Sequence, residues 1–131
     1  METKDLCVLL IEDNPADAGL IRLALSEAPG GIYRMEHVES LSRGLERLAR
    51  GGVDVVLLDL TLPDSMGLPT LDKLRDMAVG VPIVVMTGLD DEAVAGSALE
   101  RGAGGYLIKG RFSPDTLTRV LRDAIERSAR G

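Results

Sequence analysis

The amino-acid sequence predicts an α/β fold in which a parallel sheet of five strands is covered by helices on both faces. The first observation is a series of short, continuously apolar runs, of which residues 55–58 are the clearest. Such runs are typical of strands that are buried on both faces. The second observation is that a segment with apolar residues at helical spacing follows each run. Five alternations predict a doubly wound sheet with five helices and the flavodoxin-like strand order 2-1-3-4-5.

The boundaries of the elements follow from capping residues and from glycine or proline stops. Asn14 and Ser40 can each cap a helix, and Pro15 and Pro114 suit a first helical position. We predict strands at residues 6–11, 33–38, 55–58, 81–86 and 106–108, with the second strand at an edge. We predict helices from 14 to the stop at 29–31, from 40 to 51–52, from 68 to about 80, from 90 to the break at 102–105, and from 114 to about 127. Residues 60–67 are predicted as a loop, and the tail at 128–131 is expected to fray.

The composition indicates a globular protein that forms one domain over residues 1–131. Hydrophobic residues make up 45% of the chain and charged residues 27%, which excludes a disordered protein. The formal net charge of −6 argues against direct binding of nucleic acid, which favours basic surfaces. Cys7 is the single cysteine, and the sequence contains neither a signal-peptide core nor an apolar run of membrane-spanning length. We therefore expect a cytoplasmic protein without membrane contact.

Polar side chains follow four of the five predicted strands. Glu12 and Asp13 follow the first strand, Asp59 the third, Thr87 the fourth and Lys109 the fifth. These four strands are neighbours in the predicted order, so the groups meet at one edge of the sheet. Each acid alone could simply cap a helix, and the lysine could form a surface ion pair. The combination at one edge favours a functional site.

The chemistry of this set suits a metal ion and a phosphoryl group. Three carboxylates in close proximity repel one another, which raises the pKa of at least one of them unless a cation enters. Carboxylate oxygens together with water suit Mg²⁺, and a lysine with a hydroxyl suits a phosphoryl group. Asp59 can act as a nucleophile and form an acyl phosphate when a metal ion and Lys109 neutralise the developing charge.

Four motifs carry a resemblance to a known family. They are Ile11-Glu12-Asp13-Asn14, the segment 57–67 around Asp59, Val85-Met86-Thr87-Gly88, and Gly105-Tyr106-Leu107-Ile108-Lys109. With these motifs the whole chain resembles the receiver domain of bacterial two-component response regulators. The resemblance implies that Asp59 is the phospho-acceptor. It further implies a set of Mg²⁺ ligands, namely Glu12, Asp13, Asp59 and the backbone carbonyl of Thr61.

The resemblance also implies partners and a switch. A histidine kinase or a phosphotransfer protein would donate the phosphoryl group, and the receiver would assist its own phosphorylation and dephosphorylation without being an enzyme. Lys109 would pair with the phosphoryl group, and Thr87 would report its presence to Tyr106, the switch aromatic. The output would be an unknown partner, a fused output domain, or a homodimer through the fourth helix, the fifth strand and the fifth helix.

Two positions depart from the pattern of this family. Members usually have a proline with a cis peptide bond after the lysine, whereas Gly110 follows Lys109 here. A cis bond without proline costs roughly 2.5–4 kcal/mol, so we expect a trans bond and a looser loop. Leu89 stands two residues after Thr87, where many members carry a polar residue near the attacking water. We therefore expect the phosphoryl group to be lost slowly.

Two other functions fit part of this pattern. A hydrolase of the haloacid-dehalogenase type also uses an aspartate nucleophile with Mg²⁺, but its nucleophile would follow the first strand and a second acid would replace Thr61. A receiver-like module that binds partners without phosphate would not need the complete set of site residues, although Gly110 leaves this alternative open. His37 is the only histidine, and we predict a structural or surface role for it, away from the strand-end acids.

Overall fold

Short strands alternate with helices along the chain, and the computed structural model describes them over residues 5–28, 32–78, 80–88 and 92–129. The strands are β1 (Leu6–Ile11), β2 (Tyr33–Val38), β3 (Val55–Asp59), β4 (Thr61–Leu62), β5 (Ser65–Met66), β6 (Ile83–Thr87) and β7 (Gly105–Ile108). The helices are α1 (Pro15–Ser26), α2 (Leu41–Leu48), α3 (Leu68–Met77), α4 (Glu92–Glu100) and α5 (Pro114–Ala129). The predicted alternation is confirmed, and the short strands β4 and β5 are additional.

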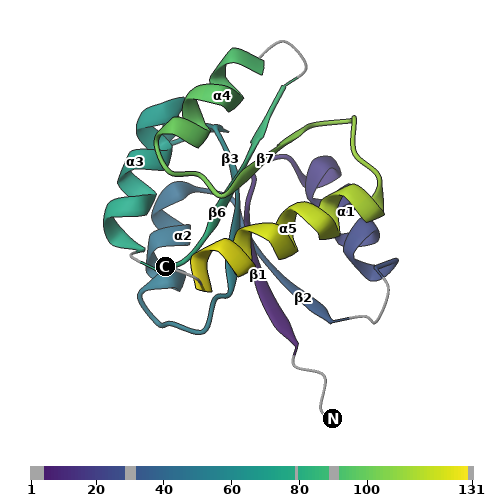
Figure 1. The fold of residues 1–131 in the computed structure, drawn as a ribbon. Helices are drawn as coiled ribbons and strands as arrows, with labels where there is room; N and C mark the ends of the chain where they lie inside the picture. Colours follow the sequence, from purple (N-terminus) through teal and green to yellow (C-terminus); the bar gives the residue numbers. More distant parts are fainter. Residues whose placement is uncertain (1–4, 29–31, 79, 89–91, 130–131) are drawn as a thin grey trace.

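Five parallel strands form the central sheet in the order β2-β1-β3-β6-β7 (Figure 1). When only these five strands are counted, the order is 2-1-3-4-5, because β4 and β5 pair with each other in a separate hairpin. The second strand lies at an edge, as predicted. The α/β class and the doubly wound, flavodoxin-like topology are therefore confirmed. The carboxyl ends of β1, β3, β6 and β7 lie along one edge of the sheet.

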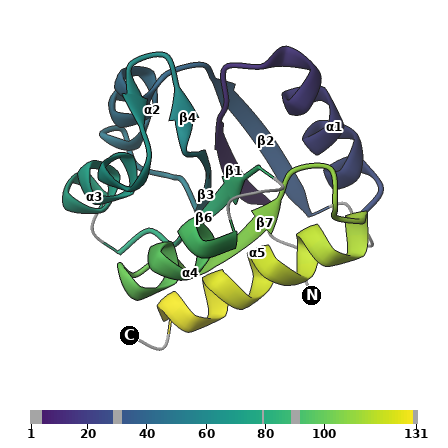
Figure 2. The same cartoon turned by 90° about the horizontal axis from the view of Figure 1, so that it is seen from above.

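Helices cover both faces of the sheet, with α1 and α5 on one face and α2, α3 and α4 on the other (Figures 1 and 2). Successive residues of β1 point to opposite faces, so Val8 and Leu10 pack under α1 and α5. Leu9 and Ile11 pack under the other three helices. All four side chains are fully buried, which explains why this strand is apolar along its whole length.

The predicted caps fix two helix starts near the edge that carries the polar groups. The Asn14 side chain accepts hydrogen bonds from the backbone N–H groups of Ala16 and Asp17, at 2.8 and 3.2 Å. The Ser40 hydroxyl accepts one from the N–H of Arg43 at 3.2 Å. Each cap satisfies donors that the first helical turn leaves without a partner. Helix α1 therefore begins at a defined place directly after β1.

The segment 60–67 is a hairpin and not the irregular loop that the sequence predicts. Strands β4 and β5 pair antiparallel, and the N–H of Gly67 donates to the carbonyl of Leu60 at 2.6 Å. The Asp64 carboxylate accepts hydrogen bonds from the N–H groups of Leu41 and Ser42, at 2.9 and 3.0 Å. These bonds lower the pKa of Asp64, since they favour its charged form. The hairpin is thus tied to the start of α2, a contact between segments distant in sequence.

Several predicted boundaries are wrong by two or more residues, among them the ends of α2 and α3, which lie at Leu48 and Met77. Strand β6 begins at Ile83 and not at 81, because the N–H of Val81 is used in a turn with the carbonyl of Ala78. Helix α1 ends at Ser26, and α5 extends to Ala129, so residues 128–129 are helical and not frayed. Residues 89–91, which include Leu89 and the predicted start of the fourth helix, lie outside the described residues. In the part of the chain that is described, no helix combines the length and apolarity needed to cross a bilayer.

Candidate functional site

The carboxyl ends of β1 and β3 bring three carboxylates together. Glu12 directly follows β1 and is fully buried, whereas its neighbour Asp13 is exposed. Asp59 is the last residue of β3, and only 3% of its surface is exposed. One carboxylate oxygen from each of the three lies within 4.8 Å of the other two. Parallel pairing of Ile11 with Leu58 explains this arrangement, because it places the residues that follow side by side.

Lys109 follows β7 and reaches these acids from across the edge of the sheet. Its Nζ atom lies 2.7 Å from Glu12 Oε1 and 3.1 Å from Asp59 Oδ2. The backbone N–H of Lys109 donates to the carbonyl of Thr87 at 2.8 Å, which continues the pairing of β6 with β7. The sheet therefore brings Glu12, Asp13, Asp59 and Lys109 together at one edge, as the sequence predicts.

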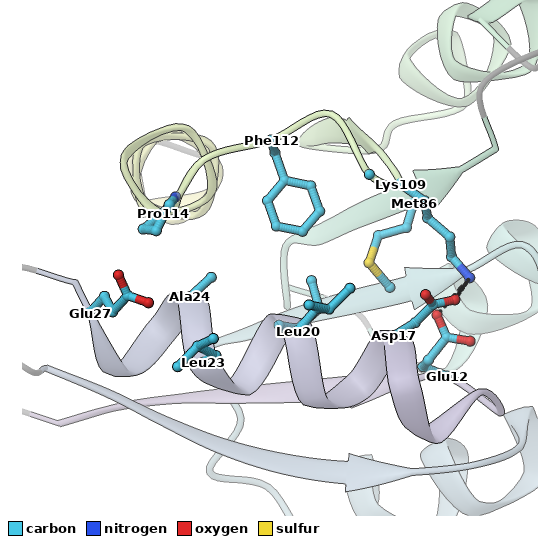
Figure 3. A pocket seen from close by; sticks show the side chains of 12 residues that line it. Glu12, Asp17, Leu20, Leu23, Ala24, Glu27, Met86, Lys109, Phe112 and Pro114 are labelled. Carbon is cyan, nitrogen blue, oxygen red and sulfur yellow. Dashed lines mark hydrogen bonds and ion pairs between the residues drawn. The ribbon is translucent and has the colours of Figure 1, made fainter.

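Asp17 is a fourth carboxylate at this edge and is absent from the predicted set. It lies in the first turn of α1, and its Oδ2 atom is 3.1 Å from Lys109 Nζ (Figure 3). The signal in the sequence is that Asp17 follows the cap Asn14 and faces back toward the residues that end β1. Strand patterns alone do not identify it, because its position depends on how α1 is rotated over the sheet.

The charge balance of the site is uneven, since one ammonium group pairs with three carboxylates and Asp13 adds a fourth at the same edge. Burial, together with the adjacent Asp59 carboxyl, raises the pKa of Glu12 to about 7, although Lys109 and the N–H of Asn14 act in the opposite direction. Burial also opposes the charge of Lys109. Its hydrogen bonds to the acids outweigh that effect and raise its pKa, so it stays an ammonium ion. The site has a fixed negative charge that one lysine does not balance.

The second oxygen of Asp59 is held by the hairpin that follows β3. The backbone N–H of Thr61, in β4, donates to Asp59 Oδ1 at 3.0 Å. Because Oδ2 contacts Lys109, both oxygens of this buried carboxylate have defined partners. Thr61 therefore lies beside Asp59, and the role of its backbone carbonyl as a metal ligand stays a prediction.

Thr87 and Tyr106 lie on the two strands at the other end of this edge. Thr87 is the last residue of β6 and is 4% exposed, and its hydroxyl oxygen has no hydrogen-bond partner among the described residues. A buried hydroxyl without a partner is uncommon in folded proteins. Tyr106 lies on β7 opposite Val85 and exposes 41% of its surface. Their roles in signalling stay predictions.

The segment after Lys109 is open. The peptide bond between Lys109 and Gly110 is trans, as expected from the absence of proline. Gly110 has a φ of +79°, and a Cβ atom built there would meet no atom of the described residues within 4 Å. The next backbone contact is the N–H of Arg111, which donates to the carbonyl of Ile108 at 3.0 Å. A tight turn, rather than side-chain packing, therefore shapes this segment.

His37 lies closer to the acids than predicted. Its Nε2 atom is 2.6 Å from the backbone carbonyl of Glu12, because Val38 at the end of β2 pairs with Ile11 at the end of β1. The expectation that His37 lies away from the strand-end acids is therefore wrong. Its contact is with the backbone of Glu12 and helps to hold the residue in place, which agrees with the predicted structural role.

An apolar groove opens from this edge, between α1 and the segment that joins β7 to α5 (Figure 3). The cavity has a volume of about 310 Å³, and Glu12, Asp17 and Lys109 line its polar end. Leu20 of α1 and the ring of Phe112 line the apolar part. The groove thus joins the lysine side of the charged edge to an apolar surface.

The donor set at this edge fits Mg²⁺. The cluster of Glu12, Asp13 and Asp59 offers only hard oxygen ligands, and one of the three residues is exposed to solvent. Mg²⁺ prefers one or two carboxylates together with water and phosphate oxygens. A divalent cation would also offset the excess of negative charge described above.

Comparisons with known proteins agree with this geometry. Residues 8–122 match the family model of the response regulator receiver domain. The chain is 36% identical over 117 residues to the nitrate/nitrite response regulator protein NarL of Escherichia coli, covering 89% of this chain and 53% of NarL. It is 36% identical over 120 residues to the KDP operon transcriptional regulatory protein KdpE of Escherichia coli, covering 92% of this chain and 51% of KdpE. The chain thus spans about half the length of these curated relatives.

Solved structures show the same fold. A response regulator receiver domain protein from Clostridium thermocellum has a TM-score of 0.81 at 22% identity, covering 95% of this chain and 97% of that one. NtrX from Brucella abortus has a TM-score of 0.82 at 25% identity, covering 95% of this chain and 28% of NtrX. With the family match over residues 8–122, these likenesses show that the chain belongs to the receiver domain family of bacterial two-component response regulators.

Proposed function

We propose that this receiver domain accepts a phosphoryl group on Asp59 with the help of Mg²⁺. The observation that carries the proposal is the position of Lys109 Nζ, 3.1 Å from a buried Asp59 carboxylate that also lies beside Glu12 and Asp13. In the proposed step, an Asp59 oxygen attacks the phosphorus atom and the bond from phosphorus to the donor breaks. The donor keeps the bonding electron pair and takes a proton from solvent.

Each residue of the edge has a part in this step. When bound, Mg²⁺ would neutralise charge on the phosphoryl oxygens, with Glu12, Asp13, Asp59 and the Thr61 carbonyl as its protein ligands. Lys109 would balance the remaining negative charge, and the Thr87 hydroxyl would donate to a phosphoryl oxygen. The buried, unpartnered hydroxyl of Thr87 supports this role, because a phosphoryl oxygen would give it an acceptor.

The donor we propose is a histidine kinase or a phosphotransfer protein, in a cytoplasmic setting that fits the single, buried Cys7. The receiver assists phosphorylation and dephosphorylation of its own aspartate and does not turn over another substrate. The hydrolase alternative is not supported by the comparisons, which match receiver domains. A domain that only binds partners is the alternative that the next experiment separates.

The test is intact-protein mass spectrometry after incubation with acetyl phosphate and Mg²⁺. Wild-type protein should gain the mass of one phosphoryl group. Asp59→Asn should gain none, because a side-chain amide is a much weaker nucleophile than a carboxylate. Asp115→Asn is the matched control, since Asp115 is an exposed acid on α5, and it should be labelled like the wild type. Labelling of Asp59→Asn would mean a different acceptor, and unlabelled wild type would favour a phosphate-independent binding module.

We further propose that phosphorylation changes the face formed by α4, β7 and α5. If Thr87 moves toward the phosphoryl group, the exposed ring of Tyr106 gains room to turn inward, and a partner or second copy that prefers this form binds better. Light scattering with beryllofluoride, a stable phosphoryl mimic, should show a higher mass for wild type and a weaker change for Tyr106→Ala. An unchanged mass, with NMR shifts confined to the surroundings of Asp59, would exclude this face as the output.

A further inference from the structure

Lys109 is held by three carboxylates, and one of them has no other role in the proposed chemistry. Glu12 follows β1, Asp59 ends β3, and both belong to the acidic cluster that fits a metal ion. Asp17 comes from α1, lies outside that cluster, and contacts Lys109 Nζ at 3.1 Å (Figure 3). The mechanism described so far assigns Asp17 no task, although its carboxylate is as near to Lys109 as that of Asp59.

The backbone that carries Asp17 is fixed. Its N–H donates to the Asn14 side chain at 3.2 Å, and Asn14 in turn donates its own N–H to Glu12 Oε2 at 3.1 Å. The first turn of α1 is therefore joined to the end of β1 by a chain of hydrogen bonds. The Asp17 carboxylate lies on a short side chain and has little rotational freedom to lose when it pairs.

The segment that carries Lys109 is less constrained than the first turn of α1. The pairing with Thr87 fixes its backbone N–H, but the chain then enters the open turn at Gly110, where no side chain packs. The lysine side chain has four rotatable bonds, and it has to reach across the edge of the sheet to Asp59. A further partner on a rigid element restricts where its ammonium group can lie.

The contacts of Lys109 have to change when a metal ion and a phosphoryl group arrive. The cation would compete for oxygens of Glu12 and Asp59, and the phosphoryl group would occupy one oxygen of Asp59. Asp17 lies outside the cluster, so neither the cation nor the phosphoryl group would compete for the oxygen that contacts Lys109. We propose that Asp17 is a positioning residue that holds the Lys109 ammonium beside the phosphoryl site, an inference that rests on the proposed function of Asp59.

A simpler explanation is that Asp17 only stabilises the start of α1, since an acid in a first turn interacts favourably with the helix dipole. That explanation makes two different predictions. Any effect of removing Asp17 would then be the same with or without Lys109, and it would appear in stability rather than in the phosphorylation rate. Asp115 allows a direct comparison, because it is also an aspartate in a first helical turn, that of α5.

The experiment measures the rate of phosphorylation by acetyl phosphate and Mg²⁺, as a function of acetyl phosphate concentration. Asp17→Asn should lower the rate constant at saturation about twofold to fivefold, the size expected when one partly exposed ion pair is lost. Mg²⁺ affinity should be nearly unchanged, and Asp115→Asn should behave like the wild type. Asp17→Glu, which keeps the charge, should recover most of the lost rate.

A double-mutant cycle with Lys109→Ala separates positioning from a general effect. In the Lys109→Ala background, Asp17→Asn should cause no further loss of the residual rate, because the group that it positions is gone. An equal loss in both backgrounds, or a wild-type rate for Asp17→Asn, would overturn the positioning role and leave the proposed function intact. No phosphorylation of the wild type would instead contradict the proposed function, and this inference with it.

Discussion

Two glutamates on neighbouring strands have opposite electrostatic environments. Glu36 lies on β2 opposite Leu9, and Glu12 directly follows the end of β1. The pKa of Glu36 is lowered to about 2, whereas that of Glu12 is raised to about 7. The two residues have the same side chain, so the difference comes from what the fold places around each: burial is the main cause for Glu12, and the hydrogen bonds of Arg47 are the main cause for Glu36.

Glu36 has matching partners. Arg47 of α2 contacts both of its oxygens, with Nε–Oε1 at 2.7 Å and Nη2–Oε2 at 3.1 Å. The hydrogen bonds from Arg47 are the main cause of the lowered pKa, with smaller help from Cys7 and Arg34. Such a fork-shaped pair satisfies the carboxylate and leaves little demand for another cation. We interpret the Glu36–Arg47 pair as structural.

Glu12 has no arginine that contacts both of its oxygens among the described residues. It is fully buried, it shares one lysine with Asp17 and Asp59, and burial is the main cause of its raised pKa. A buried carboxylate without a matching cation lowers the free energy of unfolding unless another positive charge binds beside it. The comparison therefore separates a balanced pair that supports the fold from an unbalanced cluster that is suited to bind a cation.

The largest expected effect that distinguishes the two regions is on metal binding. Asp13→Asn should weaken the binding of Mg²⁺ by about tenfold or more, because it removes one of the few carboxylates available to the ion. Glu36→Gln should leave Mg²⁺ affinity unchanged, since its carboxylate belongs to the arginine. Isothermal titration calorimetry measures both. Equal affinities of the wild type and Asp13→Asn would remove Asp13 from the ligand set.

A smaller effect concerns the free energy of unfolding at acidic pH and tests the Glu36–Arg47 pair. Because the folded-state pKa of Glu36 is below its ordinary value of 4.5, the pair stabilises the fold above about pH 4.5 and loses this effect as pH falls toward 2. The wild type should exceed Glu36→Gln by about 1 kcal/mol near neutral pH, a value reduced for the partial exposure of the side chain. Urea unfolding followed by circular dichroism provides the measurement. A difference that stays constant across this pH range would contradict the pairing.

The strand-end residues of the site could be predicted from the sequence because their positions follow from the sheet. An apolar run defines where a parallel strand ends, and the strand order then fixes which ends are neighbours. That reasoning locates Glu12, Asp13, Asp59 and Lys109 at one edge, where the structure has them. It needs no knowledge of any helix orientation.

The residues that were missed depend on contacts that no strand pattern encodes. Asp17 contacts Lys109 only through the rotation of α1, and the two are 92 positions apart in the sequence. Asp64 caps α2 from 23 positions away, which turns a predicted loop into a fixed hairpin. His37 reaches the Glu12 carbonyl through the register of β1 with β2, which the weak polarity pattern of that strand does not reveal.

The most direct test of the contrast is a pair of isosteric substitutions, Glu12→Gln and Glu36→Gln, compared by unfolding above neutral pH with and without Mg²⁺. Without Mg²⁺, Glu12→Gln should raise the free energy of unfolding by about 1 kcal/mol, since it removes an excess buried charge, and Glu36→Gln should lower it by a similar amount. Added Mg²⁺ should stabilise the wild type and Glu36→Gln more than Glu12→Gln. If both substitutions destabilise the protein and Mg²⁺ stabilises all three equally, the acidic edge is not the cation site described here.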